Sequence, residues 1–395
     1  MPATSPGPVG RRIAYYRSIA RPKMTQQQLA DRANVALGTI RKIERGERGV
    51  ADDTLDAIAA ALGVDPARLL ADRERVATRI RDALPTLSAA IAAYDVPDDG
   101  PVRPLPELRA AVAQITAWRL SAQYLQIART IPDLLAELAR ASSSAPGANA
   151  QEVARLLVTA YRAADAVAYK HGARDLSARL VELMRWAAPG ADDPLLAAAV
   201  CYVRTETFFA ARAHSAGLRS LEQAIDACPP PVGAEAVAAR GALHMRAAVI
   251  AGRADQGDAA EAHLTEARRL GDRVHEGVYQ GTAFGPDSVR IHEVSVAVSL
   301  GSEHVQRAFD VAREWKPPAD LPAERRSGFY IELARAQLWG GLADDAFESL
   351  RVARRIAPQH TREHPWVRAD AATLRRLKRA DAESLTTFAE WCHAD

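Results

Sequence analysis

The sequence predicts an all-α protein in which a small N-terminal domain of short helices precedes a long array of helical hairpins. Two observations support this fold class. Residues 24–46 read as two short helices joined by a tight polar turn. From Glu107 onward, Ala, Leu, Arg and Glu recur with a helical period that Gly and Pro interrupt, and no alternating strand pattern or β-hairpin signal stands out.

The chain begins with MPATSPGPVG, which is rich in Pro, Gly and Ser and has no apolar segment. We therefore expect residues 1–8 to form a disordered arm and not a signal peptide. The segment GRRIAYYRSIA supplies a first helix. Thr25 is a good N-cap for a second helix, and Gln28 completes a capping box. Asn34 and Val35 form the following turn, because Asn tolerates the left-handed conformation that such a turn requires.

A third helix is expected at about residues 37–45. Ile40 and Ile43 lie on its buried face, whereas Arg41 and Lys42 lie on the opposite face. Two further helices are expected at about residues 53–62 and 66–72.

The motif MTQQQLADRANVALGTIRKIERG and the helices around it, residues 9–70, resemble the helix-turn-helix domain of the Cro/repressor (XRE) family. The resemblance implies that the second helix of the motif enters the major groove of duplex DNA. It also implies a structural ion pair between Arg17 and Glu44. The expected DNA-binding residues are Gln26, Ala36, Leu37, Gly38, Thr39, Arg41, Lys42, Arg45 and Arg48.

Leu37 and Gly38 stand where this family usually has polar base readers. Direct readout is therefore expected to rest on Arg41, Lys42 and apolar contact with thymine methyl groups. The alternative is that both cations are solvated surface charges. The charge distribution favours DNA contact: residues 1–50 hold ten Arg or Lys against three Asp or Glu, and residues 51–72 hold one against five. The whole chain has a net charge of only +2, so a general polyanion binder is not expected.

Residues 73–95 read as a helix interrupted at Pro85, and residues 96–106, VPDDGPVRPLP, as a Pro-rich hinge. A leading helical pair is expected at residues 107–143. The expected domains are the arm 1–8, the DNA-binding domain 9–72, the linker helix and hinge 73–106, and the sensor and dimerisation domain 107–395.

The segment SGFYIELARAQLWGGLADDAFESLRVARRIAP fits the tetratricopeptide template, in which small residues let two helices approach closely. We expect a solenoid of similar, degenerate repeats. Its five hairpins lie at roughly residues 150–189, 193–229, 235–272, 285–317 and 322–358, with a terminal capping pair at 362–393.

The first helix of each hairpin would line a concave groove, and these helices carry many polar and aromatic residues. The expected ligand-binding residues are Tyr161, Asp165, Tyr202, Arg204, Glu206, Phe208, Arg212, His244, Arg246, Tyr279, Phe284 and His292. For each, the alternative is a core aromatic or a solvated charge. Tyr279 and Phe284 belong to GVYQGTAFGPDSV, expected to be a structured loop, which resembles a segment of many actinobacterial regulators; a long inter-repeat turn is the alternative.

Together, the two parts resemble the peptide-pheromone receptors of Gram-positive bacteria, which bind a short peptide through the repeats and dimerise. Those receptors grip the peptide with Asn side chains, whereas this chain has only Asn34 and Asn149. A ligand held by Arg, Tyr, His and Glu would be an anionic small molecule or a peptide gripped differently. We expect a cytoplasmic, homodimeric regulator that binds an operator in double-stranded DNA. The alternative is that the repeats dock a partner protein without a small ligand.

Several other classes of protein are not expected. The three cysteines are far apart, which predicts neither a metal site nor a disulfide and suits a reducing cytoplasm. The sequence contains no run of about 18 apolar residues, so no membrane span is expected. HExxH, CxxC, G-x-S-x-G and phosphate-binding Gly loops are absent from the sequence, so neither an enzyme nor a cofactor is expected.

Overall fold

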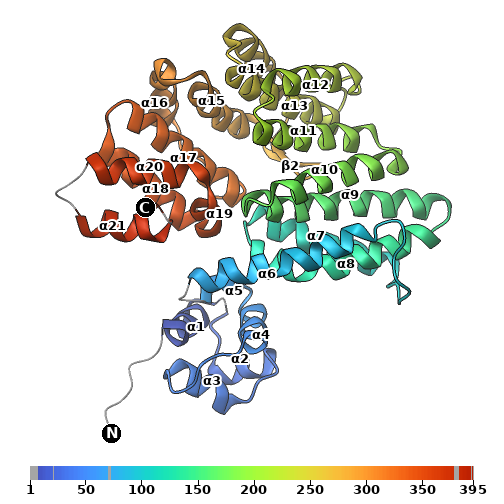
Figure 1. The fold of residues 1–395 in the computed structure, drawn as a ribbon, viewed down its shortest axis with the longest axis vertical. Coiled ribbons are helices and arrows are strands. Elements are labelled where there is room, and N and C mark those ends of the chain that lie inside the picture. The colour runs from blue at the N-terminus through green and yellow to red at the C-terminus, as the bar shows by residue number, and fades with distance from the viewer. Residues whose placement is uncertain (1–7, 21, 70–72, 378–381, 393, 395) are drawn as a thin grey trace. The chain divides into compact units, whose positions relative to one another are not determined.

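The computed structural model describes residues 8–20, 22–69, 73–377, 382–392 and 394. The chain divides into two compact units, one comprising Met1–Thr86 with Ala128–Thr130 and the other comprising Leu87–Ile127 with Ile131–Asp395. The predicted all-α class is confirmed, with one small β-hairpin as the exception (Figure 1). Of the expected N-terminal arm, residues 1–7 lie outside the described part of the chain.

The first unit contains the expected short helices. They are α1 (Pro8–Ile19), α2 (Gln26–Arg32), α3 (Leu37–Glu44), α4 (Asp52–Leu62) and α5 (Pro66–Leu69). Ile13, Leu29 and Ile40 are fully buried and form their shared core. The predicted capping box is present, because the Thr25 hydroxyl accepts from the Gln28 N–H at 3.1 Å and the Gln28 side chain accepts from the Thr25 N–H at 2.8 Å.

The helix α6 (Arg73–Ala92) runs through Pro85, so the predicted interruption there is wrong. Proline removes one backbone hydrogen bond from a helix. Ile80, Leu87 and Ile91 are nevertheless buried at helical spacing, and burial of this stripe outweighs the lost bond. Residues 93–104, which include most of the predicted hinge, form no helix.

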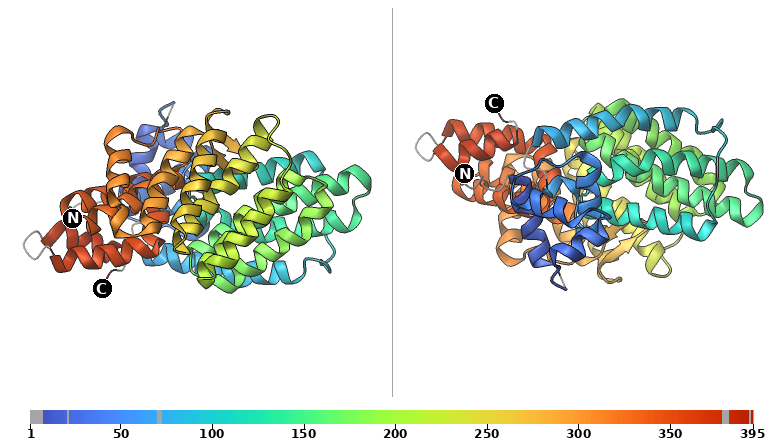
Figure 2. Two further views of the ribbon diagram at one scale, coloured as in Figure 1. Left: turned by 90° about the horizontal axis from the view of Figure 1, so that it is seen from above. Right: turned by 90° about the horizontal axis from the view of Figure 1, so that it is seen from below.

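The second unit is a stack of helical hairpins (Figures 1 and 2). The helices α7 (Leu105–Leu120) and α8 (Tyr124–Ser144) precede five hairpins, whose ends lie within a few residues of the ranges expected from the sequence. The hairpins are α9 (Gly147–Lys170) with α10 (Arg174–Ala187), α11 (Pro194–Ala211) with α12 (His214–Ala227), α13 (Ala234–Arg253) with α14 (Gly257–Gly271), α15 (Pro286–Leu300) with α16 (Val305–Glu314), and α17 (Ala323–Trp339) with α18 (Ala343–Ile356). A short 3₁₀ turn, η1 (Ala188–Ala191), lies between the first and second hairpins, and another, η2 (Ser302–His304), lies between the two helices of the fourth.

Small residues set the close approach of the paired helices. Ala247 and Ala248 of α13 and Ala260 and Ala267 of α14 are all fully buried. Each hairpin also packs on the next, because the first helices α11, α13, α15 and α17 contact one another in series. The solenoid thus buries a continuous core, as stacked repeats require.

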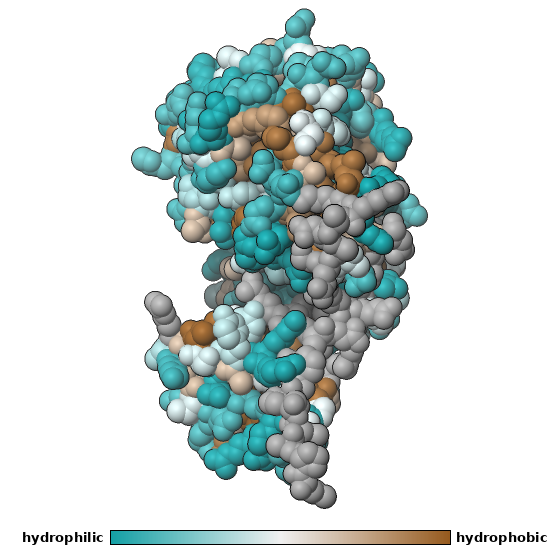
Figure 3. Space-filling model, turned by 90° about the vertical axis from the view of Figure 1, so that its left-hand side faces the viewer, coloured by the Kyte–Doolittle hydropathy of each residue, from teal (hydrophilic) through white to brown (hydrophobic). Residues whose placement is uncertain are grey.

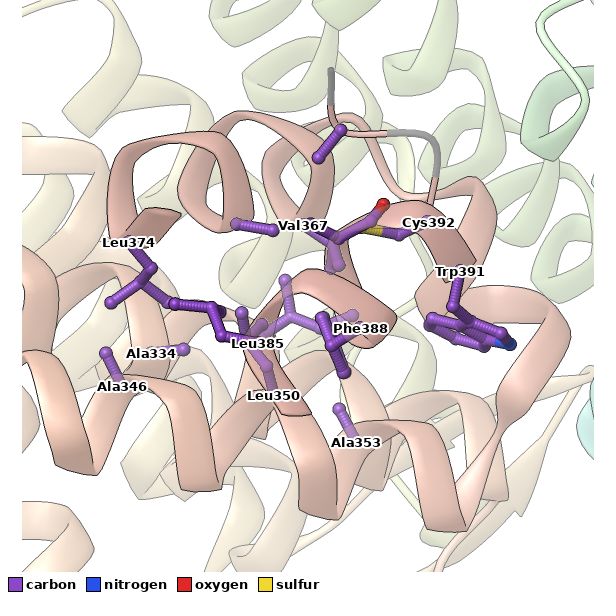
Figure 4. Close-up of a cluster of buried hydrophobic side chains, with 14 residues drawn as sticks. Ala334, Ala346, Leu350, Ala353, Val367, Leu374, Leu385, Phe388, Trp391 and Cys392 are labelled. Atoms are coloured by element: carbon purple, nitrogen blue, oxygen red, sulfur yellow. The ribbon is translucent and has the colours of Figure 1, made fainter. Parts of the chain in front are cut away.

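The last hairpin is covered by α19 (Pro358–Glu363), α20 (Pro365–Leu377) and α21 (Ala382–Trp391). Figure 4 shows Leu374 of α20, Phe388 of α21 and Leu350 of α18 as members of one buried apolar cluster. This cluster hides the apolar end of the stack. The expected capping pair at 362–393 corresponds to α20 and α21, and residues 378–381 and 393 of that range lie outside the described residues.

Strands β1 (Gly277–Tyr279) and β2 (Thr282–Phe284) form an antiparallel hairpin between α14 and α15. The sequence predicts a loop here, and that prediction is wrong. Three-residue strands are too short to show an alternating pattern. Gln280 and Gly281 have φ values of 46° and 70°, as the two central residues of a type I′ turn require. Phe284 is fully buried and packs directly on Gly241, where any Cβ would lie 1.9 Å from the Phe284 ring.

The surface shown in Figure 3 is mostly hydrophilic, and apolar residues gather in one area of the repeat unit. Among the described residues, no helix is long and apolar enough to cross a membrane.

Candidate DNA-binding motif and ligand-binding face

The helix α3 presents two opposite faces. Ile40 and Ile43 are buried against the rest of the unit, whereas the side chains of Arg41 and Lys42 are exposed. This separation leaves a basic, solvent-facing surface on the helix that the sequence predicts to read DNA. Of the other expected contacts, Ala36, Gly38, Arg45 and Arg48 are exposed, and Gln26, Leu37 and Thr39 are half-buried.

Glu44, the last residue of α3, is buried, with 9% of its surface exposed, and it connects α3 to the two preceding helices. Arg17 donates from Nε to one Glu44 oxygen at 2.8 Å and from Nη2 to the other at 2.9 Å. The hydrogen bonds to Glu44 raise the pKa of Arg17. The Gln26 side chain also donates to Glu44, at 2.7 Å. The expected ion pair is therefore present, and Gln26, expected at a phosphate, is bound to Glu44 in the absence of DNA.

In the repeat unit, the first helices converge so closely that distant repeats touch. The Lys170 ammonium at the end of α9 lies 2.8 Å from a Glu324 oxygen on α17. Burial by itself would raise the pKa of Glu324, but the positive charge of Lys170 lowers it below the usual value. Arg325, the next residue on α17, donates to the Tyr202 hydroxyl of α11 at 2.6 Å. The first and fifth hairpins thus meet through charged side chains.

Further polar groups continue this inner face. The Arg246 guanidinium of α13 lies 4.4 Å from the Tyr202 ring centroid and 3.6 Å from a Glu206 oxygen. Ser177 donates to the Asp165 carboxyl at 2.5 Å. Burial, together with the neighbouring Glu206, raises the pKa of Asp165 well above its usual value, which favours the neutral acid. We call the side chains that share these contacts the inner network, and its members are Asp165, Lys170, Tyr202, Glu206, Arg246, Glu324 and Arg325.

Five of the expected ligand residues face this region: Asp165, Tyr202, Glu206 and Arg246 in the inner network, and His292 beside it. His292 is bonded to the Ser288 carbonyl at 2.8 Å, and burial together with the nearby Arg325 lowers its pKa to about 3.

The other expected ligand residues lie elsewhere. Arg204 reaches Ser220 of α12, and Phe208 packs near Gly217 of the same helix. His244 faces His263 of α14, with their Nδ1 atoms 3.0 Å apart. The remaining four are placed as follows: Tyr161 and Phe284 are buried in the core, Arg212 is exposed at the end of α11, and the Tyr279 hydroxyl donates to the His275 carbonyl.

Several residues of this face were not predicted, among them Arg119, Arg162, Lys170, Glu324 and Arg325. A usable signal was present in the sequence. Polar residues recur three or four apart on one stripe of each first helix, as in Arg162, Asp165 and Tyr169. Such a stripe occupies the side opposite the small residues that pack against the partner helix. Searching for stripes, and not for single aromatic or charged residues, would have found the α9 members.

Comparison with known protein families supports the helix-turn-helix motif expected in the first unit. Residues 20–69 match the protein family described as helix-turn-helix. This segment is a helix-turn-helix domain of the XRE type, the class of domain found in DNA-binding regulators. No curated protein sequence matches the chain.

One solved structure is similar to the chain. It is the crystal structure of Bacillus thuringiensis PlcR in complex with the peptide PapR7 and DNA. The alignment has 15% identity and a TM-score of 0.31, and it covers 67% of this chain and 95% of that one. At this level, the likeness is no evidence for a shared ligand.

Proposed function

We propose that this chain is a sequence-specific, DNA-binding transcriptional regulator whose repeat unit senses a small molecule or peptide and mediates homodimerisation. The observation that carries the proposal is the exposed basic face of α3 within a domain of helix-turn-helix type. Arg41 and Lys42 would supply most of the base contacts, because Leu37 and Gly38 carry no polar side chain. Gln26, Ala36, Thr39, Arg45 and Arg48 would complete the surface on the DNA, in part through phosphates.

The inner network supports the sensing role. Charged groups from α9, α11, α13 and α17 converge on one face of the repeat unit. Burying charges costs free energy, so a chain that needed only a stable core would gain more from apolar residues there. A ligand that bound some of these groups would favour one arrangement of the repeats over another.

The proposed dimerisation rests on the way helix-turn-helix proteins of this class read paired half-sites. Two copies of the motif would bind half-sites about one helical turn, ~10 base pairs, apart. The repeat unit would then set the separation of the two motifs. Sedimentation of the full chain at micromolar concentration tests this part, and a monomer that binds its operator as a monomer would contradict it.

Genome-wide footprinting of the full chain, followed by binding to a recovered site at moderate salt, tests DNA recognition. We expect the double variant Arg41→Ala/Lys42→Ala to lose at least tenfold in preference for that site over random DNA, because each good bidentate base contact is worth about 1–3 kcal/mol. The control is Arg174→Ala/Arg219→Ala, which removes the same charge from exposed positions of α10 and α12. No preference in the wild-type chain, or unchanged preference in the α3 variant, would contradict the assignment.

A further inference from the structure

The tip of the β-hairpin contacts two arginines from distant helices. Arg119 of α7 donates to the Gly281 carbonyl at 2.6 Å. Arg162 of α9 donates to the Gln280 carbonyl at 2.7 Å and to the Thr282 hydroxyl at 2.6 Å. These bonds span 118 to 162 residues of sequence. The hairpin therefore joins the third and fourth repeats to the beginning of the stack.

In the part of the chain that the structure describes, the hydrogen-bond partners of these two guanidinium groups are neutral oxygen atoms. Among the described residues, no carboxylate lies within ion-pair distance of Arg119 or Arg162. Burial lowers the pKa of Arg119, and burial together with the charge of Arg119 lowers the pKa of Arg162 to about 9. Two positive charges are thus held close together without an opposite charge bonded to either. An anion at this place would offset the cost of burying them.

A cavity of about 120 Å³ lies beside these arginines. The side chains of α7, α9, α10 and α11 line it, and the hairpin tip, Gln280 and Gly281, borders it. Its walls are mostly apolar and include Val158, Met184, Leu196, Val200 and Val203. Arg119 and Arg162 are its charged members. An apolar chamber with a few convergent polar groups is the usual form of a small-molecule site.

We propose that this cavity, which we call the tip cavity, binds a small organic anion whose carboxylate or phosphate head bonds to Arg119 and Arg162 and whose apolar body fills the space between α9 and α11. The inference rests on the proposed sensing function and names the class of ligand. A dry cavity of about 150 Å³ holds one benzene molecule. The tip cavity therefore suits a slightly smaller body, such as a short branched hydrocarbon chain.

Binding in the tip cavity would change the order of the β-hairpin, because both contact the same two arginines. A guanidinium has five N–H donors, so the two arginines have ten. Their hydrogen bonds to the hairpin use three of these ten. An anionic head can therefore bind alongside the tip carbonyls and hold the arginines in the positions that the hairpin needs. Binding would then order β1 and β2 and slow hydrogen exchange of residues 277–284.

Calorimetric titration of the full chain without DNA tests the site. The probes are sodium isovalerate and isobutyl phosphate, which share a branched body and differ in the source of the anionic head, and isovaleramide, which is the neutral control of the same shape. We expect saturable binding of one or both anions at millimolar concentration, slower exchange of residues 277–284 on binding, and no binding of the amide. Arg162→Gln should weaken anion binding at least tenfold, because hydrogen bonds between charged groups are lost.

The matched control is Arg204→Gln, which alters an arginine on α11 that contacts Ser220 of α12 and not the cavity. The affinity of this variant for the anions should equal that of the wild type. If Arg162→Gln does not fold, Val200→Ile, which adds one methylene group to the cavity wall, should weaken binding by reducing the space. Equal binding of amide and anion, unchanged affinity in the cavity variants, or no saturable binding of either anion by the wild type would overturn the proposal. DNA is absent from these measurements, so their failure is separate from loss of operator preference in the Arg41→Ala/Lys42→Ala variant.

Discussion

Arg325 of α17 donates a hydrogen bond to the Tyr202 hydroxyl of α11 at 2.6 Å, although 123 residues separate them in the sequence. Tyr202 is 3% exposed. Burial by itself would raise the pKa of Tyr202, but the charges of Arg246 and Arg325 lower it below its usual value. This bond ties two hairpins that are not neighbours in the stack and so helps to hold the inner network together.

Tyr202→Phe removes this bond and leaves the Arg325 guanidinium without its partner. Hydrogen bonds to charged groups contribute about 1.5–3 kcal/mol, so we expect the free energy of unfolding to fall by about 2 kcal/mol in urea denaturation. Tyr330→Phe is the control, because it removes a half-buried hydroxyl from α17 for which no hydrogen bond is found within the described structure. A loss of equal size in both variants would show that the cross-stack bond contributes nothing.

Arg17→Ala should destabilise the helix-turn-helix unit. The variant leaves the buried Glu44 carboxylate with Gln26 as its remaining side-chain partner, and an unsatisfied buried charge costs about 2 kcal/mol or more. Thermal unfolding should show a lower transition temperature. Adding Glu44→Gln should recover part of the loss, because the amide carries no charge. No recovery in the double variant would mean that lost packing, and not the stranded charge, causes the effect.

Gly241→Ala should displace the β-hairpin. The new methyl group would lie 1.9 Å from the Phe284 ring, and overpacking of this kind costs about 1–3 kcal/mol. Faster hydrogen exchange of residues 277–284 is the expected readout. Gly328→Ala is the matched control, because its nearest neighbour atom would be 4.0 Å away; in a helix this change is expected to stabilise by about 0.5–1 kcal/mol. Unaltered exchange in Gly241→Ala would contradict the anchoring role of Phe284.

The protein should lose stability as the pH falls below about 6.5, in part through His360. Its ring lies 3.1 Å from the Lys170 ammonium and 2.7 Å from the Ser327 hydroxyl. Burial, and then the charge of Lys170, lowers the pKa of His360 to about 3, although Glu324 opposes this. The unfolded chain therefore binds a proton first, and the contribution present above pH 6.5 is lost as the pH falls towards 3.

We expect His360→Gln to reduce the slope of unfolding free energy against pH by up to about 1.4 kcal/mol per pH unit between pH 6 and 4. Glutamine can accept from Lys170 and donate to Ser327 without gaining a proton. Urea denaturation across this range measures the slope. His304→Gln is the control, because His304 is exposed and meets water in both states. Parallel slopes for wild type and His360→Gln would contradict the prediction.

The sequence by itself determined the helix-turn-helix motif and the five hairpins. Caps, turns and helical periodicity act between residues a few positions apart, so Thr25 with Gln28 and the small residues of α13 and α14 could be read directly. Pro85 shows the limit of local rules, because tertiary packing buries Ile80, Leu87 and Ile91 of α6 and this burial decides that the helix continues.

Only the tertiary structure decided which polar residues meet. The curvature of the stack brings Lys170 to Glu324 and Arg325 to Tyr202, and the β-hairpin brings Gly281 to Arg119 across 162 residues. The register between repeats depends on how each interface packs, and small rotations per repeat add up along a solenoid. Arg204 and His244 are polar enough to bind a ligand, but they face α12 and α14 and not the inner network. Local sequence patterns do not predict which helix such a side chain faces.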